Sequence, residues 1–286
     1  MIIALAFAAF PTLAASAALA VACAILSVIV ILRGWAFAGE GISHSGFGGA
    51  GTAWLLALLV PALDQPWVPY VAVVIFCLIT ALAIGRVTRG GRVTSDAAVG
   101  IFLVASLAWG FLARQVYHQR RGMFPAEADT LLFGSSAPLS PQFALAAASL
   151  AAAVVIVIAL LGKEILAYCF DPLTAQTSGV PTGWIHDLLM VLLAVTIVLG
   201  TRVAGSVLVV ALLVLPGVTA MLLSRRLGRV IAISIIIALL GAAAGVLISA
   251  RWPFIPSGPA IVLCLFVQFV LAMLVVRVSR ISTATL

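Results

Sequence analysis

The chain has 286 residues, of which 65% are hydrophobic and only 8% are charged, and its formal net charge is +7. A soluble domain needs more charge to cover its surface, so this composition excludes one and indicates an integral membrane protein. The apolar runs are long and do not alternate every second residue, which favours membrane helices over a barrel. The positive charge is typical of basic cytoplasmic loops, and nucleic-acid binding is a poor interpretation of it.

Nine apolar stretches predict the membrane spans, because most of them are near the roughly 20 residues that cross a bilayer as a helix. They cover residues 12–32, 42–62, 67–85, 96–113, 142–162, 184–201, 203–223, 229–250 and 258–276. We therefore expect an all-α integral membrane protein, a bundle of eight or nine transmembrane helices in a single domain, residues 1–286. The lower count applies if one stretch is re-entrant.

Basic residues set the expected orientation of these spans. With the N-terminus outside, most of the 15 Lys and Arg residues fall on the cytoplasmic side. Cytoplasmic loops carry the excess of positive charge in membrane proteins, so we predict an external N-terminus and a cytoplasmic C-terminus.

The second stretch begins with the segment Gly39-Glu40-Gly41-Ile42-Ser43-His44-Ser45, and a run of glycines follows it. A carboxylate and an imidazole four residues apart share one face of a helix, and together they suit a first-row divalent metal. Glu40 and His44 are therefore candidate metal ligands; the alternative is an interfacial pair beside Arg33. Glycines expose backbone carbonyls, which membrane proteins tolerate only where the backbone faces protein or a watery cavity. This favours a pathway role.

Asp96 stands at the start of the fourth stretch, and a long loop of about residues 114–141 follows that stretch. A charge at the bilayer centre costs about 2.5–3.5 kcal/mol, so a buried carboxylate would indicate a transport pathway. Asp96 also follows Ser95 at a predicted helix start, where a negative charge suits the macrodipole and can stay hydrated. The loop is predicted to be external, either as a solvated connection or as a docking surface for an external partner.

A second long loop lies on the predicted cytoplasmic side, between the fifth and sixth stretches. Asp171 is a good N-cap, the proline after it suits the first helical position, and Gly179 is a good helix stop. These residues predict a helix of about two turns at the membrane surface over residues 171–179. Its role is either specific docking of a partner or plain connection.

Two later segments carry polar groups or breaks. His186 and Asp187 begin the sixth stretch, where they are either hydrated or part of a pathway. Pro216-Gly217 lies inside the seventh stretch and predicts a kink that frees a carbonyl group. No nucleotide-binding Gly-x-x-x-x-Gly-Lys loop and no common hydrolase motif is present in the sequence. We therefore expect no enzyme activity and no permanently bound cofactor.

Six motifs in the right order resemble the membrane-spanning subunits of ATP-binding-cassette importers for zinc, manganese and iron. The resemblance runs from about residue 10 to 280. It lies in Gly39–Ser45, Asp96–Ile101, Leu132–Gly134, Phe170–Gly179, Gly205–Ala220 and Pro256–Pro259. The first motif of the family carries Asp where this chain has Glu40, which is one methylene longer.

The resemblance implies the fold of type II importers and a homodimer that works with two ATPase subunits, which bind the ATP. It implies an external or periplasmic metal-binding protein, a prokaryotic plasma (inner) membrane, and manganese, zinc or iron as the transported ion. The competing class is a stand-alone secondary transporter or channel for a cation. A string of intramembrane acidic residues is typical of that class and is sparse here.

The resemblance also implies roles for single residues. Glu40 and His44 would hold the ion transiently, and the further candidate pathway residues are Ser43, Asp96, His186 and Asp187. The helix that couples to the ATPase in the family matches Phe170, Asp171, Ala175 and Gly179. Pro216 and Gly217 match a helix break. Since the first motif belongs to the family's translocation path, we expect the glycine-rich part after it to be a broken helix.

Overall fold

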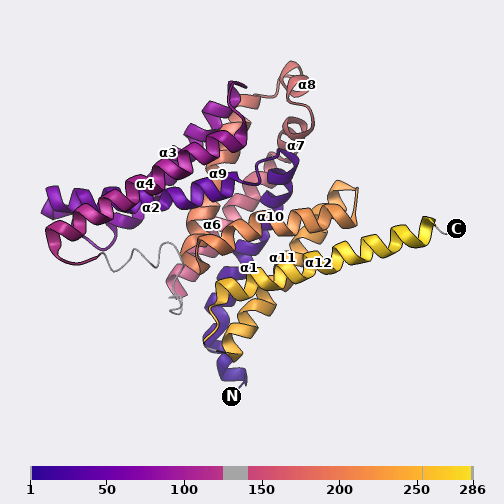
Figure 1. Ribbon diagram of the computed structural model, residues 1–286. Coiled ribbons are helices and arrows are strands. Elements are labelled where there is room, and N and C mark those ends of the chain that lie inside the picture. Colours follow the sequence, from indigo (N-terminus) through magenta and orange to yellow (C-terminus); the bar gives the residue numbers. More distant parts are fainter. Residues whose placement is uncertain (1, 125–140, 253, 285–286) are drawn as a thin grey trace. The chain divides into compact units, whose positions relative to one another are not determined.

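The computed structural model describes residues 2–124, 141–252 and 254–284. Every regular element assigned in these residues is a helix (Figure 1). They are α1 (Ile2–Leu32), α2 (Ala38–Leu59), η1 (Pro61–Leu63), α3 (Val68–Arg89), α4 (Ser95–Arg121), α6 (Pro141–Leu160), α7 (Gly162–Phe170), α8 (Pro172–Thr177), α9 (Thr182–Ala204), α10 (Ser206–Leu223), α11 (Leu227–Arg251) and α12 (Ser257–Ala284). The all-α prediction is confirmed for these residues. Most of the predicted external loop lies outside them, and its first residues, through Arg121, extend α4.

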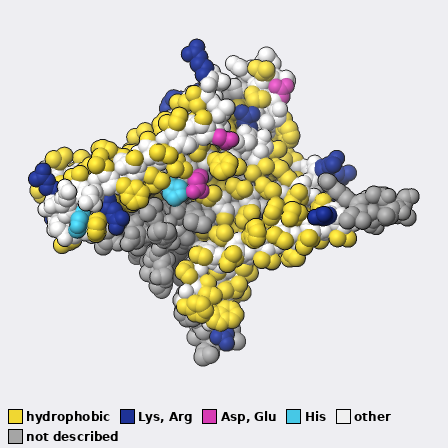
Figure 2. Space-filling view, in the orientation of Figure 1, with side chains coloured by type: hydrophobic (Ala, Val, Ile, Leu, Met, Phe, Trp, Pro, Cys, Tyr) yellow, Lys and Arg dark blue, Asp and Glu magenta, His cyan; other side chains and the backbone are white. Residues whose placement is uncertain are grey.

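The helices have the composition of membrane spans. Among the described residues, five helices are long and apolar enough to cross a bilayer, and a sixth is counted if α6 and α7 form one span. On the face drawn in Figure 2, hydrophobic side chains cover most of the described surface and charged ones are few. A surface of this kind is stable against lipid and would be a liability in water.

The chain folds into two compact units. The first contains Met1–Ala36, Ser136–Gly162 and Val207–Leu286, and the second contains Phe37–Ser135 and Lys163–Ser206. In the second unit, α2 packs against α3, α4 and α9. In the first, α1 packs against α6 and α11, and α11 packs against α12.

Glycines on α2 allow unusually close packing in the second unit. A Cβ atom added to Gly49 would lie 2.8 Å from the Ala72 carbonyl oxygen and from the Val73 Cα atom, and one added to Gly48 would lie 2.9 Å from the Ser106 carbonyl oxygen. The expectation of a broken helix is therefore wrong: α2 is continuous from Ala38 to Leu59 and its glycines are buried. Contacts with α3 and α4 offset the poor helix propensity of glycine.

The direction of each helix follows from these contacts. Gly41 lies against Val99 and Gly51 against Gly110, so α2 and α4 run parallel. Gly41 also lies near Ile84 whereas Gly49 lies against Ala72, so α3 runs antiparallel to α2. The amino ends of α2 and α4 and the carboxyl end of α3 therefore lie at one end of the second unit.

Replacing Gly49 with Ala should destabilise the protein by about 1–3 kcal/mol, because the added methyl group meets backbone atoms that cannot move aside. The matched control is Gly100→Ala on α4, where an added Cβ has nothing within 4 Å. That change should be neutral or slightly stabilising, because alanine is the better helix former. Thermal unfolding in detergent measures both, and equal midpoints for the two variants would contradict the packing described for α2.

Proline 216 lies inside α10, where it removes one N–H group from the helical hydrogen-bond ladder. Ser27 of α1 bonds to the backbone beside it. The Gly217 N–H donates to Ser27 Oγ at 2.9 Å, and Ser27 Oγ donates to the Val214 carbonyl oxygen at 3.3 Å. Ser234 of α11 also bonds to α1, to the Ala24 carbonyl oxygen at 2.8 Å. Serine hydroxyls thus connect three helices of the first unit.

Replacing Ser27 with Ala should cost about 1–3 kcal/mol, because it leaves the buried Gly217 N–H without this acceptor. Ser149→Ala on α6 is the control, since that exposed hydroxyl bonds only to its own helix, at Ala146. The unfolding midpoint should fall for Ser27→Ala alone. A fall of the same size in both variants would show that Ser27 has no special role at the proline.

Candidate functional site

Glu40 and His44 lie in the first two turns of α2, inside the second unit. Glu40 Oε1 and His44 Nε2 are 2.9 Å apart, which is a hydrogen bond across one helical turn. The side chain of His44 is 24% exposed and that of Glu40 is 40% exposed. The carboxylate stands at the amino end of a helix, where the macrodipole favours negative charge. The predicted pair is thus formed, and it remains accessible.

Two atoms at this site, one in His44 and one in its neighbour Ser43, are buried and have no hydrogen-bond partner among the described residues. They are His44 Nδ1 and Ser43 Oγ. An unpaired buried polar atom is costly, and a ligand is one of the explanations for it. Carboxylate oxygen, imidazole nitrogen and hydroxyl oxygen are donors that manganese, iron and zinc accept. Glu40, Ser43 and His44 are therefore a small set of candidate metal donors on one helix.

This set is incomplete as a metal site within one chain. In the part of the chain that the structure describes, no group of three or more His, Cys, Asp or Glu residues could hold a metal ion. Zinc takes about four ligands and manganese takes more. Glu40 and His44 thus supply two donors of a site that takes four or more ligands.

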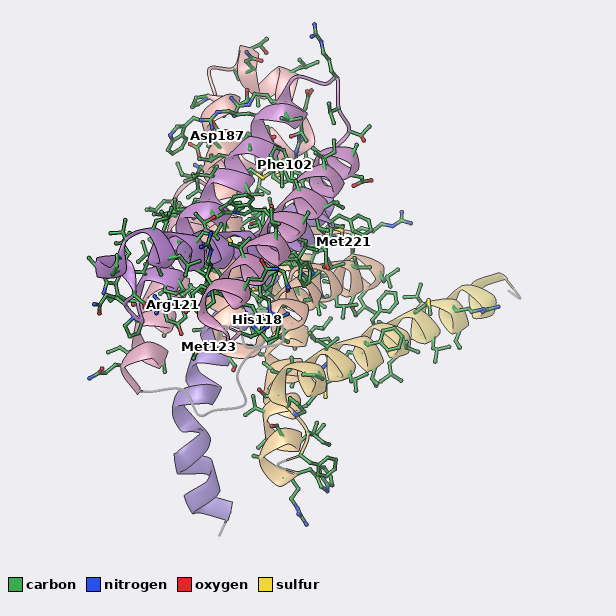
Figure 3. The ribbon with its side chains drawn as sticks, turned by 60° about the vertical axis from the view of Figure 1, so that its left-hand side comes forward. Phe102, His118, Arg121, Met123, Asp187 and Met221 are labelled. Carbon is green, nitrogen blue, oxygen red and sulfur yellow. The ribbon has the colours of Figure 1, made fainter. Side chains whose placement is uncertain are left out.

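The structure gives the other candidate pathway residues separate surroundings. Asp96 is exposed in the first turn of α4, behind the N-cap Thr94. His186 is buried in α9, where Nδ1 lies 2.7 Å from the Tyr168 hydroxyl and Nε2 lies 3.0 Å from the Gly85 carbonyl oxygen. Asp187, labelled in Figure 3, forms an ion pair with Arg89 of α3. Both α9 residues thus bond to neighbouring helices.

The capped helix predicted over residues 171–179 is present as α8, which covers Pro172–Thr177. Asp171 Oδ1 accepts hydrogen bonds from the Leu173 and Thr174 N–H groups, each at 3.1 Å. The Thr174 hydroxyl donates to Asp171 Oδ2 at 2.5 Å. Gly179 ends the segment with a φ of +87°, which other residues rarely adopt. The docking role of this helix stays a proposal.

Hydrogen bonds to the carboxylate, first from the Thr174 hydroxyl and then from its N–H, lower the pKa of Asp171. A lowered pKa in the folded state means that the cap contributes stability above the ordinary pKa of the carboxyl. That contribution is lost as the pH falls through the lowered value. The helix is therefore fully capped at neutral pH.

Of the exposed side chains around α8, Phe170 belongs to the motif and Leu173 does not. The motif emphasises Ala175, which is only 4% exposed and packs against its own chain. Leu173 is 77% exposed and Phe170 is 67% exposed. Both large apolar side chains are thus available at the surface beside α8. Leu173 stands two positions before the buried Ala175, which places the two side chains on opposite faces of a helix.

The model of the ABC 3 transport family matches residues 7–276. This chain belongs to the ABC 3 transport family. It is 33% identical over 262 residues to the manganese transport system membrane protein MntC of Halalkalibacterium halodurans, covering 91% of this chain and 84% of that one. It is 30% identical to the chelated iron transport system membrane protein YfeD of Yersinia pestis, covering 89% of this chain and 80% of that one.

A solved relative of this ABC 3 family chain has a closely similar fold. The structure of PsaBC from Streptococcus pneumoniae in complex with Fab contains a chain that is 25% identical. The match has a TM-score of 0.76 and covers 95% of each chain. The resemblance inferred from the six motifs is therefore confirmed, and with it the class of all-α membrane permease.

Proposed function

We propose that this chain is the membrane-spanning subunit of an ATP-driven importer for a divalent metal ion, and that it forms the translocation pathway. The observation that carries the proposal is the family match over residues 7–276. The relatives named above are manganese and iron transport proteins, and the donor atoms on α2 suit both metals as well as zinc.

Glu40 and His44 hold the ion transiently on its way through the membrane, with Ser43 as a further donor. One chain supplies too few ligands, which supports a homodimer with the pathway between two copies. A twofold axis would bring two carboxylates and two imidazoles together, and a symmetric interface of this kind is the commonest in oligomers. Asp96, exposed at the same end of the unit, serves as a hydrated residue at the pathway mouth.

The chain spans the prokaryotic plasma membrane nine times, or eight if one apolar helix is re-entrant. Nine is reached when α1, α2, α6 and α10 join the five long apolar helices. The end of the second unit where α3 terminates carries Arg86, Arg89 and Arg92, which supports a cytoplasmic position for that end. The external N-terminus and a kink at Pro216-Gly217, within the continuous helix α10, belong to the same proposal.

Two further proteins complete the transporter. An ATP-binding-cassette ATPase binds at α8, where Phe170 and Leu173 are exposed and Asp171 and Gly179 define the ends of the helix. A metal-binding protein delivers the ion at the outer face. Closure of the ATPase pair on ATP moves α8, and that movement opens the pathway alternately to each side.

Purification of the tagged chain from its native membrane tests the class of transporter. An ATP-binding-cassette ATPase should co-purify, and proteoliposomes that contain the complex should take up radioactive manganese only when ATP is supplied. Uptake driven by an ion gradient without ATP would instead identify a secondary transporter. Competition among unlabelled manganese, iron and zinc then establishes the preferred ion.

A further inference from the structure

Three helices of the second unit meet at a buried hydrogen-bonded chain of side chain and backbone. The Tyr168 hydroxyl of α7 lies 2.7 Å from His186 Nδ1 of α9, and His186 Nε2 lies 3.0 Å from the Gly85 carbonyl oxygen of α3. Tyr168 is 4% exposed and His186 is 6% exposed. These three residues, Tyr168, His186 and Gly85, are called the latch below.

The direction of the hydrogen bonds in the latch follows from its chemistry. A carbonyl oxygen can only accept, so His186 Nε2 carries a hydrogen and donates it to Gly85. In the neutral ring, Nδ1 then accepts from the Tyr168 hydroxyl. Removal of one group therefore takes a buried hydrogen bond away from its neighbour, which is costly in a buried place. An apolar contact would allow the helices to slide past one another, whereas these hydrogen bonds require one arrangement of the three helices.

Close packing of the helix backbones reinforces the latch. A Cβ atom added to Gly85 would lie 3.0 Å from His186 Nε2 and 3.1 Å from Met190 Cγ, so a larger residue would push these side chains back by a few tenths of an ångström. One turn along α3, Arg89 Nη2 donates to the Gly183 carbonyl oxygen at 2.7 Å and also bonds to Asp187. The carboxyl end of α3 is thus held to the amino end of α9 at two successive levels.

The latch brackets α8. Tyr168 precedes the Asp171 cap on one side of α8, and His186 follows Gly179 on the other. The Val180 N–H also donates to the Ala175 carbonyl oxygen at 3.0 Å, which closes α8 onto the start of α9. A displacement of α8 would therefore act on α7 and α9, which are hydrogen-bonded to each other, and α9 is also bonded to α3.

The helix at the far side of the latch packs on the metal donors. Helix α3 packs along α2, and Ile84, next to Gly85, lies near Gly41. Gly41 follows Glu40 directly and precedes His44 by one turn or less. Two sets of contacts therefore connect α8 with the candidate metal donors: the hydrogen bonds of the latch and the packing of α3 on α2.

We propose that Tyr168, His186 and Gly85 act as positioning residues that transmit movement of α8 to α3, and so to Glu40 and His44 on α2. The proposal rests on the proposed function, in which an ATPase moves α8. None of the three touches the ion. Their effect is on the coupling between ATP hydrolysis and transport, and not on metal binding or on ATP hydrolysis itself.

The variant Tyr168→Phe removes one hydroxyl and nothing else. The complex should still assemble and hydrolyse ATP within about twofold of the unsubstituted rate, while manganese uptake per ATP hydrolysed falls about fivefold, the effect of one lost hydrogen bond. Tyr70→Phe, at the opposite end of α3, is the matched control and should leave this ratio unchanged. The ratio is the readout, because a purely structural defect lowers uptake and hydrolysis together.

Two substitutions of His186 test the two hydrogen bonds of the latch separately. His186→Gln retains a donor near the Gly85 carbonyl oxygen, and His186→Asn retains a polar group near the Tyr168 hydroxyl. Each should lower the uptake-to-hydrolysis ratio as Tyr168→Phe does. Adding Tyr168→Phe to His186→Gln should lower it no further, because the hydrogen bond to His186 Nδ1 is already absent.

The results that would overturn the proposal are specific. An unchanged ratio in Tyr168→Phe would show that the hydroxyl transmits nothing. Proportional loss of uptake and hydrolysis in all three variants, with less folded complex recovered, would show a role in stability alone. If the unsubstituted chain binds no ATPase, the proposed function itself fails, and that result is visible before any variant is made.

Discussion

Replacing His44 with Ala should abolish metal uptake while the complex assembles and hydrolyses ATP at nearly its normal rate. Even loss of a second-shell partner costs a metal site roughly 10–100-fold, so loss of a donor should cost more. His44 Nδ1 is buried without a partner among the described residues and Nε2 bonds only to Glu40 of the same helix, so its removal disturbs little of the fold. Uptake of radioactive manganese into proteoliposomes measures the effect.

Thr52→Ala is the control for this experiment. Thr52 is also a polar residue on α2, but it accepts a hydrogen bond from Trp109 Nε1 at 3.0 Å and donates to the Gly48 carbonyl oxygen, so it has a packing role. It should retain uptake. Normal uptake in His44→Ala would refute the site. Glu40→Asp, which installs the acid typical of the family, should retain uptake and change the preference among manganese, iron and zinc.

Replacing Leu173 with Arg should prevent the ATPase from co-purifying. Burial of a leucine side chain contributes about 1.5–3 kcal/mol, which is roughly 10- to 100-fold in affinity, and a charge in an apolar pocket adds to the loss. Leu173 is 77% exposed in the isolated chain, so the change leaves α8 folded. Retention of the ATPase on affinity purification, followed by its ATPase activity, provides the measurement.

Leu173 is the most informative position for this test, because its substitution leaves α8 folded. Ala175→Arg and Asp171→Arg would also lose the ATPase, but Ala175 is buried in its own chain and Asp171 caps the helix, so both changes unfold α8. Val60→Arg is the control for Leu173→Arg. Val60 is also exposed, and it lies at the carboxyl end of α2. An ATPase that remains bound to the Leu173→Arg chain would exclude docking at α8.

Local features were predictable from the sequence. The cap of α8 depends on Asp171 and its next three residues, and the Glu40–His44 pair depends on one helical turn. Both are short-range and need no knowledge of the fold. The helical composition of the whole chain was equally evident, because long apolar runs in a membrane have few alternatives to helix.

Features that depend on distant partners were not predictable. The glycines of α2 suggested a break, and only the presence of α3 and α4 shows that they serve close packing. His186 bonds to Gly85 and Asp187 bonds to Arg89, each about a hundred positions earlier in the chain. No periodicity within α9 reveals such partners.

The glycine face of α2 predicts how this helix tolerates mutation. At Gly48 and Gly49 the backbones of α4 and α3 leave no room for a side chain, so a saturation library should accept almost nothing larger than glycine, whatever its polarity. Glu40 and His44 are partly exposed, so selection there should depend mainly on donor chemistry. One helix would thus show two kinds of intolerance, to size and to chemistry, and metal preference could be redesigned in its first two turns without repacking the membrane domain.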